Sequence, residues 1–159
     1  MKKFALLGVV VFIIYIVFCL RYGKYIHISS KIEINIPLSA KLEYIDTHGG
    51  FHGDGETFAK VYLTEKQSEK VKKNIENNEN WKRLPMSENL QNDVGQYLTA
   101  KMNMPSIENG YWFFLDRNSE AYNKYDENEM YKEKRYSSNF SVAVFDIDTN
   151  ILYYHETDT

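Results

Sequence analysis

Residues 46–56 read DTHGGFHGDGE, and this stretch decides how the middle of the chain is organised. It holds four of the eight glycines, two of the four histidines and three carboxylates. Glycines cluster where the backbone must adopt a positive φ or where another group comes close. Strand-like residues flank the stretch at 41–45 and 57–63, so the sequence predicts a long hairpin with this tip. We expect at least one of its glycines to have φ > 0.

The N-terminal region carries a long apolar run. Residues 4–20 are seventeen positions without a charged side chain, with Lys2 and Lys3 before them and Arg21 and Lys24 after them. A membrane-spanning helix needs about 20 apolar residues, with a lower limit near 17. The core of a signal peptide is shorter, about 7–15 residues. The run therefore predicts that the chain enters a membrane through residues 4–20.

The sequence after the run favours an anchor that stays on the protein. No small-x-small cleavage site follows, and Phe18 stands before Cys19, where a lipoprotein signal needs a small residue. We expect a membrane anchor over residues 1–24 and a single domain over 25–159, with a cleaved signal peptide as the alternative. The slight excess of positive charge before the span predicts an extracytoplasmic domain.

The charge of the predicted domain restricts its partners. The whole chain has a net charge of −3, but the anchor region holds four basic residues and no acidic ones. Residues 25–159 therefore carry 15 basic and 22 acidic side chains, a net charge of −7. This balance argues against nucleic acid as a partner and against a domain lying flat on an anionic membrane. Because Cys19 is the only cysteine, the chain can form no disulfide within itself and no thiolate zinc site.

Hydrophobic periodicity indicates an α+β domain. Residues 24–37 place isoleucines at even positions, which is typical of a half-buried strand. Residues 64–77 predict the main helix, because Thr64 and Gln67 form a capping box. Residues 87–98 predict a short helix, with Gly95 as a weak point.

The C-terminal half adds the remaining strands. The run 110–116 predicts a buried strand, and residues 139–146 and 151–156 predict a hairpin. Between them, residues 118–138 are polar and predict an irregular segment with a helical turn near 127–132. We therefore expect a mostly antiparallel sheet of five or six strands with one main helix packed on one face.

The glycine-rich stretch also holds the candidate site. His48 and His52, with Asp46, Asp54 and Glu56, offer the nitrogen and oxygen ligands that zinc or iron uses. His48, His52 and Asp54 are the metal-ligand candidates, and the same five residues are candidates for binding a ligand or partner. The alternative is a purely structural tip, in which glycines meet backbone demands and carboxylates hydrogen-bond to the turn. Convergence of His48, His52, Asp46 and Asp54 on a cleft would favour chemistry.

Several quoted segments resemble a group of small uncharacterised proteins of Gram-positive, clostridia-like bacteria. They are DTHGGFHGDGE at 46–56, WK-x-LP at 81–85, IENGYWFF-x-DR at 107–117 and DTN-x-LYY at 148–154. The resemblance covers most of residues 42–159 and implies a bacterial source. It brings no activity, ligand or catalytic residue with it.

Two functions follow as hypotheses. The first is a membrane-anchored, non-enzymatic binding or interaction domain, such as a partner-binding, sensing or immunity-type protein, with no cofactor and with a protein as the possible partner. The second is a metal-dependent hydrolase that uses the 46–56 loop. Nucleophilic catalysis has little support, because the only cysteine lies in the apolar run and the chain has no Gly-x-Ser-x-Gly motif.

Overall fold

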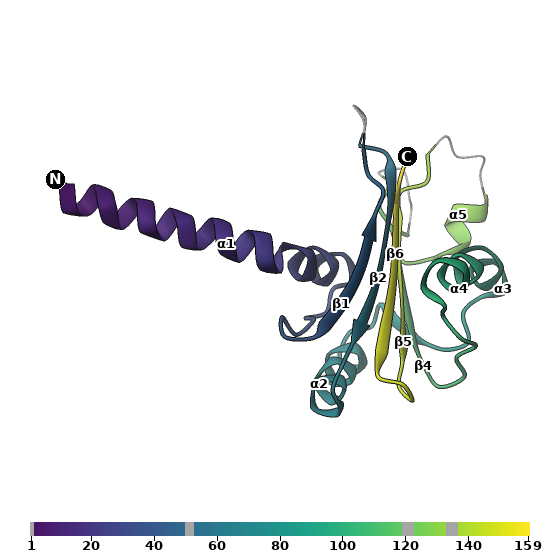
Figure 1. Cartoon of the computed structure of the whole chain (residues 1–159). Coiled ribbons are helices and arrows are strands. Elements are labelled where there is room, and N and C mark those ends of the chain that lie inside the picture. The colour runs from purple at the N-terminus through teal and green to yellow at the C-terminus, as the bar shows by residue number, and fades with distance from the viewer. Residues whose placement is uncertain (1, 50–52, 119–122, 133–136) are drawn as a thin grey trace.

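The protein is a six-stranded antiparallel sheet covered by helices on both faces, with one long helix projecting from it (Figure 1). The computed structural model describes residues 2–49, 53–118, 123–132 and 137–159. The strand order is β1-β2-β6-β5-β4-β3, and every neighbouring pair is antiparallel. The strands are β1 (Lys41–Asp46), β2 (Gly55–Tyr62), β3 (Trp81–Arg83), β4 (Gly110–Asp116), β5 (Phe140–Asp146) and β6 (Ile151–Asp158).

The helices are α1 (Lys2–Ile32), α2 (Glu65–Glu76), α3 (Glu88–Leu90), the π-helical turn η1 (Gln91–Gly95), α4 (Gln96–Met102) and α5 (Asn128–Lys132). These elements confirm the predicted α+β class, the hairpin around the 46–56 stretch and the C-terminal hairpin. The predicted helical turn near 127–132 is α5. The helix predicted from residue 87 continues to Met102, and it passes through the π-helical turn at the position of Gly95.

The predicted strand over residues 24–37 is wrong, because α1 runs without a break to Ile32. Ile28 and Ile32 are fully buried and lie four residues apart, a spacing that satisfies a helix as well as a strand. Ile26, which belongs to the same alternation, is exposed. Glu33 then adopts φ 58° and ends the helix. The helix consequently passes through the expected boundary at residue 24 and enters the core of the domain.

The sheet separates two hydrophobic clusters, one on each face. We call the side covered by α1 and α2 the anchor face and the side covered by α3, η1 and α4 the far face (Figure 1). Strand β5 shows the alternation: Ala143 and Phe145 pack on the anchor face, and Val142 and Val144 pack on the far face. The far-face helices form a second helical layer beyond the main helix that the sequence predicts.

Helix α2 forms as its sequence predicts. The Thr64 side chain accepts a hydrogen bond from Gln67 N, and the Gln67 side chain accepts one from Thr64 N, which completes the capping box. The helix buries Val71 and Ile75 against the anchor face. Its polar remainder faces solvent, as its narrow apolar stripe requires.

Candidate functional site

The glycine-rich hairpin tip is held by local hydrogen bonds. Asp46 Oδ1 accepts from the backbone N of His48 at 3.0 Å and lies 2.7 Å from His48 Nδ1. Gly53 has φ +72°, which confirms the expectation of a positive φ in this stretch. Gly55 comes so close to His48 that an added Cβ would lie 2.5 Å from His48 Cα. Two of the glycines therefore meet backbone demands, as the structural interpretation of the tip requires.

His48 connects the tip to the end of the last strand. Its Nε2 lies 3.2 Å from Asp158 Oδ2, so the imidazole sits between two carboxylates. Burial alone would lower the pKa of His48, but the hydrogen bonds to Asp46 and Asp158 outweigh it and raise the pKa above its usual value. The backbone hydrogen bond from His48 lowers the pKa of Asp46.

A buried carboxylate, Glu156, continues this set of contacts on the anchor face. Only 2% of its side chain is exposed. Its Oε2 lies 2.6 Å from His27 Nε2 and accepts a hydrogen bond from the Tyr154 hydroxyl at 2.6 Å. Its Oε1 lies 3.0 Å from Lys31 Nζ and 3.2 Å from Arg117 Nη2, close enough for charge pairing although neither contact has good hydrogen-bond geometry.

The partners of Glu156 keep it ionised. Burial would raise its pKa, but the hydrogen bonds from His27 and Tyr154 and the nearby charges of Lys31 and Arg117 lower that pKa far below its usual range. Burial, followed by the charge of Glu156, raises the pKa of the Tyr154 hydroxyl. The buried charge is therefore compensated by cations from α1 and from the residue after β4.

Arg117 joins the two halves of this arrangement. Its Nη1 donates to Asp158 Oδ1 at 2.7 Å, and its Nη2 donates to Thr157 O at 2.8 Å and lies beside Glu156. An unbroken path of polar contacts thus runs from the hairpin tip to the long helix. We call it the relay; its members are Asp46, His48, Asp158, Arg117, Glu156, His27 and Lys31.

The far face carries a different cluster at the same end of the sheet. His155 is buried, its Nε2 lies 3.4 Å from Glu56 Oε1, and its ring lies nearly parallel to those of Phe58 and Tyr97. The Phe58 and Tyr97 centroids are 4.5 Å and 5.9 Å from the imidazole centroid. Burial lowers the pKa of His155, although Glu56 and Asp93 act in the opposite direction.

The structure divides the predicted site residues between these two clusters. Asp46 and His48 belong to the relay, whereas Glu56 belongs to the far-face cluster. Asp54 is exposed, and its backbone O accepts from Gly49 N at 3.4 Å. His52 lies outside the described residues. Within the described part of the chain, no three His, Cys, Asp or Glu side chains form a group suited to a metal ion. A metal site that includes His52 stays a prediction.

Sequence reasoning missed most of the relay and, apart from Glu56, the members of the far-face cluster. His27, Lys31, Arg117, Glu156 and Asp158 come from segments far apart in the chain, and no spacing motif connects them. The one available signal is the alternation along β6, which sends Tyr154 to the anchor face and Tyr153 to the far face. The same alternation places Glu156 on the anchor face and His155 on the far face.

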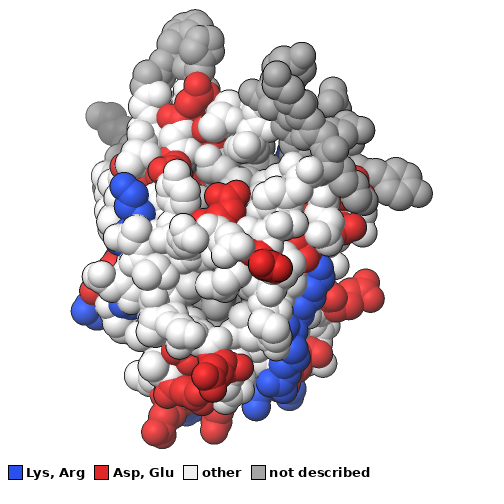
Figure 2. Space-filling view, turned by 90° about the vertical axis from the view of Figure 1, so that its right-hand side faces the viewer, with Lys and Arg blue, Asp and Glu red and all other residues white. Residues whose placement is uncertain are grey.

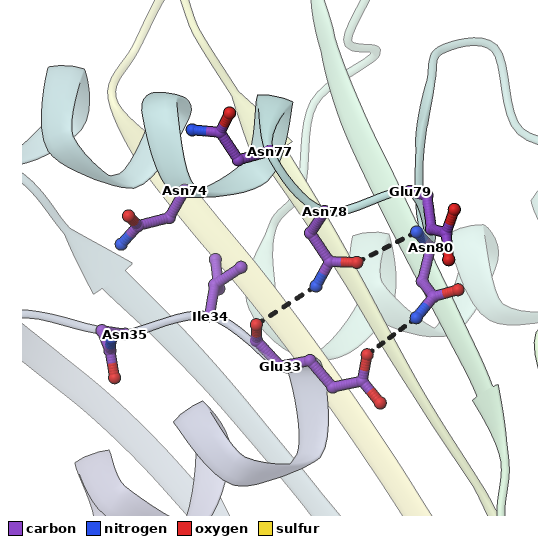
Figure 3. A pocket seen from close by; sticks show the side chains of 8 residues that line it. All are labelled: Glu33, Ile34, Asn35, Asn74, Asn77, Asn78, Glu79 and Asn80. Atoms are coloured by element: carbon purple, nitrogen blue, oxygen red, sulfur yellow. Dashed lines mark hydrogen bonds between the residues drawn. The ribbon is translucent and has the colours of Figure 1, made fainter.

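A polar hollow lies where α1 and α2 end. It has a volume of about 510 Å³, and its lining residues are Glu33, Ile34, Asn35, Asn74, Asn77, Asn78, Glu79 and Asn80 (Figure 3). Glu33 is fixed there: its O accepts from Asn78 Nδ2, its Oε2 from Asn80 Nδ2 and its Oε1 from the Tyr125 hydroxyl. These bonds tie the end of the long helix to the α2–β3 connection.

Comparison with protein-family models, with curated protein sequences and with solved structures finds no match to this chain.

Proposed function

We propose that this chain is a bacterial, membrane-anchored binding domain without catalytic activity, which presents the 46–56 hairpin tip to a protein partner outside the cytoplasm. One observation carries the proposal: the relay connects the tip to the same helix that is long and apolar enough to span a membrane. A partner that contacts the tip would therefore be connected to the anchor through the side-chain contacts of the relay.

The long helix supports the anchoring role. Leu7 to Ile32 is the one described helix with the length and hydropathy of a membrane span. Its large apolar side chains between Leu7 and Leu20 are all exposed, and no part of the domain covers them. In water, this much exposed apolar surface would be unfavourable. A bilayer around the first part of α1 removes this cost.

The helix also fixes the domain to the anchor. The apolar part of α1 leads directly into Ile28 and Ile32, which are fully buried in the core of the anchor face. Lys31 and His27 on the same turns pair with Glu156. No linker intervenes between the span and the core, so the domain holds a defined orientation relative to the span.

The position of the tip fits the presentation of a binding surface. The β1–β2 connection and the C-terminus lie at the same end of the sheet (Figure 1). Asp46 and Asp54 are exposed there. Hairpin tips held by a rigid scaffold commonly carry binding residues, because the scaffold positions them at little entropic cost.

The anchoring part of the proposal is tested by fractionation of cells that express the full chain. We expect the protein in the membrane fraction, released by detergent and not by high salt or alkali. Protease treatment of intact cells should then remove the domain. Recovery of the full-length chain in the soluble fraction without detergent would contradict the anchor, and protection from protease would contradict the extracytoplasmic side.

The binding part is tested separately by site-specific photo-crosslinking in membranes. A photo-reactive residue at position 54 should give a discrete protein adduct. The same residue at position 73, on the exposed surface of α2, is the matched control and should not give that adduct. Absence of any adduct at 54, or the same adduct at both positions, would contradict a partner site at the tip.

A further inference from the structure

The far face holds a hollow that the proposed function does not use, and one of its lining residues, Tyr97, stacks on the buried His155. The hollow has a volume of about 410 Å³, within the range of small-molecule sites. Its lining residues are Asn92, Asp93, Gln96, Tyr97, Ala100 and Lys101. They come from η1 and α4, and π-helical turns such as η1 occur frequently at functional sites.

His155 does not line the hollow but is stacked on one of its lining residues, Tyr97, and it has an unused acceptor. The Tyr97 ring lines the hollow and lies nearly parallel to the imidazole, 5.9 Å from centroid to centroid. Only 3% of the His155 side chain is exposed, and its Nδ1 has no hydrogen-bond partner among the described residues. A buried polar atom without a partner is costly and is rare in native structures. Such an atom behind a residue that lines a hollow suggests that a group entering the hollow completes its pairing.

The pairing of His155 determines what its free nitrogen can do. Glu56 Oε1 lies 3.4 Å from Nε2, so the carboxylate favours the tautomer with the proton on Nε2. Burial also keeps the imidazole neutral by lowering its pKa. Nδ1 then carries a lone pair and accepts a hydrogen bond. The missing group is therefore a hydrogen-bond donor.

The charges around the hollow select the kind of donor. Asp93 lines it, and the negative charges of both Glu56 and Asp93 act on His155, where they raise its pKa against the effect of burial. The half-exposed Tyr97 offers a ring face, which attracts cations. The Tyr131 hydroxyl lies 3.4 Å from Asp93 Oδ2 and holds this carboxylate at the hollow. Lys101 is the opposing cation among the lining residues. Acidic side chains lie over the middle of this face (Figure 2).

We propose that the hollow lined by Asp93 and Tyr97 beside His155 binds a small organic cation that carries N–H donors, namely an alkylguanidinium or a primary ammonium group. The ligand's charge pairs with the Asp93 carboxylate, its apolar part lies on Tyr97, and an N–H bonds to His155 Nδ1. Because Nδ1 is buried and Tyr97 is the lining residue stacked on His155, the half-exposed Tyr97 side chain has to swing aside for the third contact and then packs on the ligand's apolar part from its new position. The site lies on the opposite face from the relay and does not depend on the binding role of the hairpin tip.

The test uses the full-length protein, with ¹⁵N-labelled histidine, in phosphatidylcholine nanodiscs. Methylguanidinium should shift the His155 Nδ1 resonance in a saturable way. Tetramethylammonium has the same charge but no N–H donor, so it should leave that resonance in place. Propionate should also have no effect, because Asp93 and Glu56 repel an anion. Equal shifts from methylguanidinium and tetramethylammonium, or no shift with methylguanidinium, would overturn the proposal.

Variants locate the site. Asp93→Asn should weaken the binding of methylguanidinium about tenfold, because it removes a charge-assisted hydrogen bond. Glu108→Gln is the matched control: it removes one exposed carboxylate before β4, away from the hollow, and should leave binding unchanged. Tyr97→Leu should also weaken binding, and it provides a second measurement if Asp93→Asn fails to fold. Affinities equal to those of the control would overturn the assignment to this hollow.

Discussion

His155 and Glu156 are neighbours on β6, yet they face opposite sides of the sheet and differ in how completely they are paired. On the anchor face, Glu156 contacts His27, Lys31, Arg117 and Tyr154. On the far face, His155 has one distant carboxylate and one nitrogen without a described partner. Both side chains are almost completely buried.

The difference in pairing between Glu156 and His155 illustrates two roles that a buried polar group can have. A fully compensated charge fixes the elements that supply its partners, and here those elements are α1, β6 and the segment after β4. An incompletely paired group retains hydrogen-bonding capacity at a cost in stability, which is typical of a site that binds something. The contacts on the anchor face therefore join the domain to α1, and the far face retains one buried nitrogen without a described partner.

The largest expected effect comes from breaking the pairing on the anchor face. Glu156→Gln removes the negative charge that compensates Lys31 and Arg117, and we expect it to destabilise the protein by about 3 kcal/mol. His155→Phe is the comparison on the far face: it keeps a ring for Phe58 and Tyr97 and removes the unpaired nitrogen. We expect it to be neutral or slightly stabilising.

Urea unfolding of the full chain in mild detergent, followed by the fluorescence of Trp81 and Trp112, measures both changes. The comparison between the two faces fails if His155→Phe costs as much stability as Glu156→Gln. A smaller but still clear excess for Glu156→Gln would support it, since Lys31 and Arg117 are partly exposed and water compensates part of the loss.

The second expected effect tests how the hairpin tip reaches the relay. A Cβ at position 55 would lie 2.5 Å from His48 Cα, so Gly55→Ala must displace the backbone that seats His48. We expect a loss of about 2 kcal/mol, as for other overpacked positions. Gly49→Ala is the matched control in the same tip, because its added Cβ would find nothing closer than 3.9 Å. The same urea experiment should show little change for it.

If Gly55→Ala proved as harmless as Gly49→Ala, the contact between residues 55 and 48 would not determine the conformation of the tip. The His48–Asp158 contact would then have to be maintained in another way. A shift of the His48 ring resonances in Gly55→Ala alone would connect the stability loss to the relay.

Local interactions made much of the fold predictable from the sequence. The Thr64–Gln67 capping box joins residues three positions apart, and the Asp46–His48 contact joins residues two positions apart. Contacts this short in sequence can be recognised from the residue pattern alone. The isoleucine series misled because a separation of four residues between Ile28 and Ile32 fits both a strand and a helix. The continuous helix also places these residues directly after the apolar part of α1, and tertiary packing decides their structure.

Non-local pairing made the site unpredictable. His27 and Glu156 are 129 positions apart, and Arg117 and Asp158 are 41 apart. These contacts follow from β6 lying between β2 and β5, a strand order that the hydrophobic pattern does not specify. The alternation along β6 predicts that residues 155 and 156 face opposite sides, but it does not say which helices cover each side.

The smallest expected effect concerns the pH dependence of the relay. The folded state raises the pKa of His48, so its protonation stabilises the fold. This contribution is fully present below the unfolded value of about 6.5 and is lost as the pH rises through the higher folded value. Because 24% of the His48 side chain and larger fractions of Asp46 and Asp158 are exposed, we expect less than about 1 kcal/mol.

The difference in unfolding free energy between the wild type and His48→Gln isolates this contribution, and it should be larger at pH 6 than at pH 9. Glu156 does not interfere, because its lowered pKa gives a contribution that is lost only as the pH falls below about 4.3. His155 has the opposite sign, since its lowered pKa destabilises the fold as the pH falls below about 6.5, but it is present in both proteins and cancels. A difference that stayed constant from pH 6 to pH 9 would mean that His48 is not ion-paired with Asp46 and Asp158 in solution. The relay would then stop at Asp158, and the hairpin tip would be independent of α1.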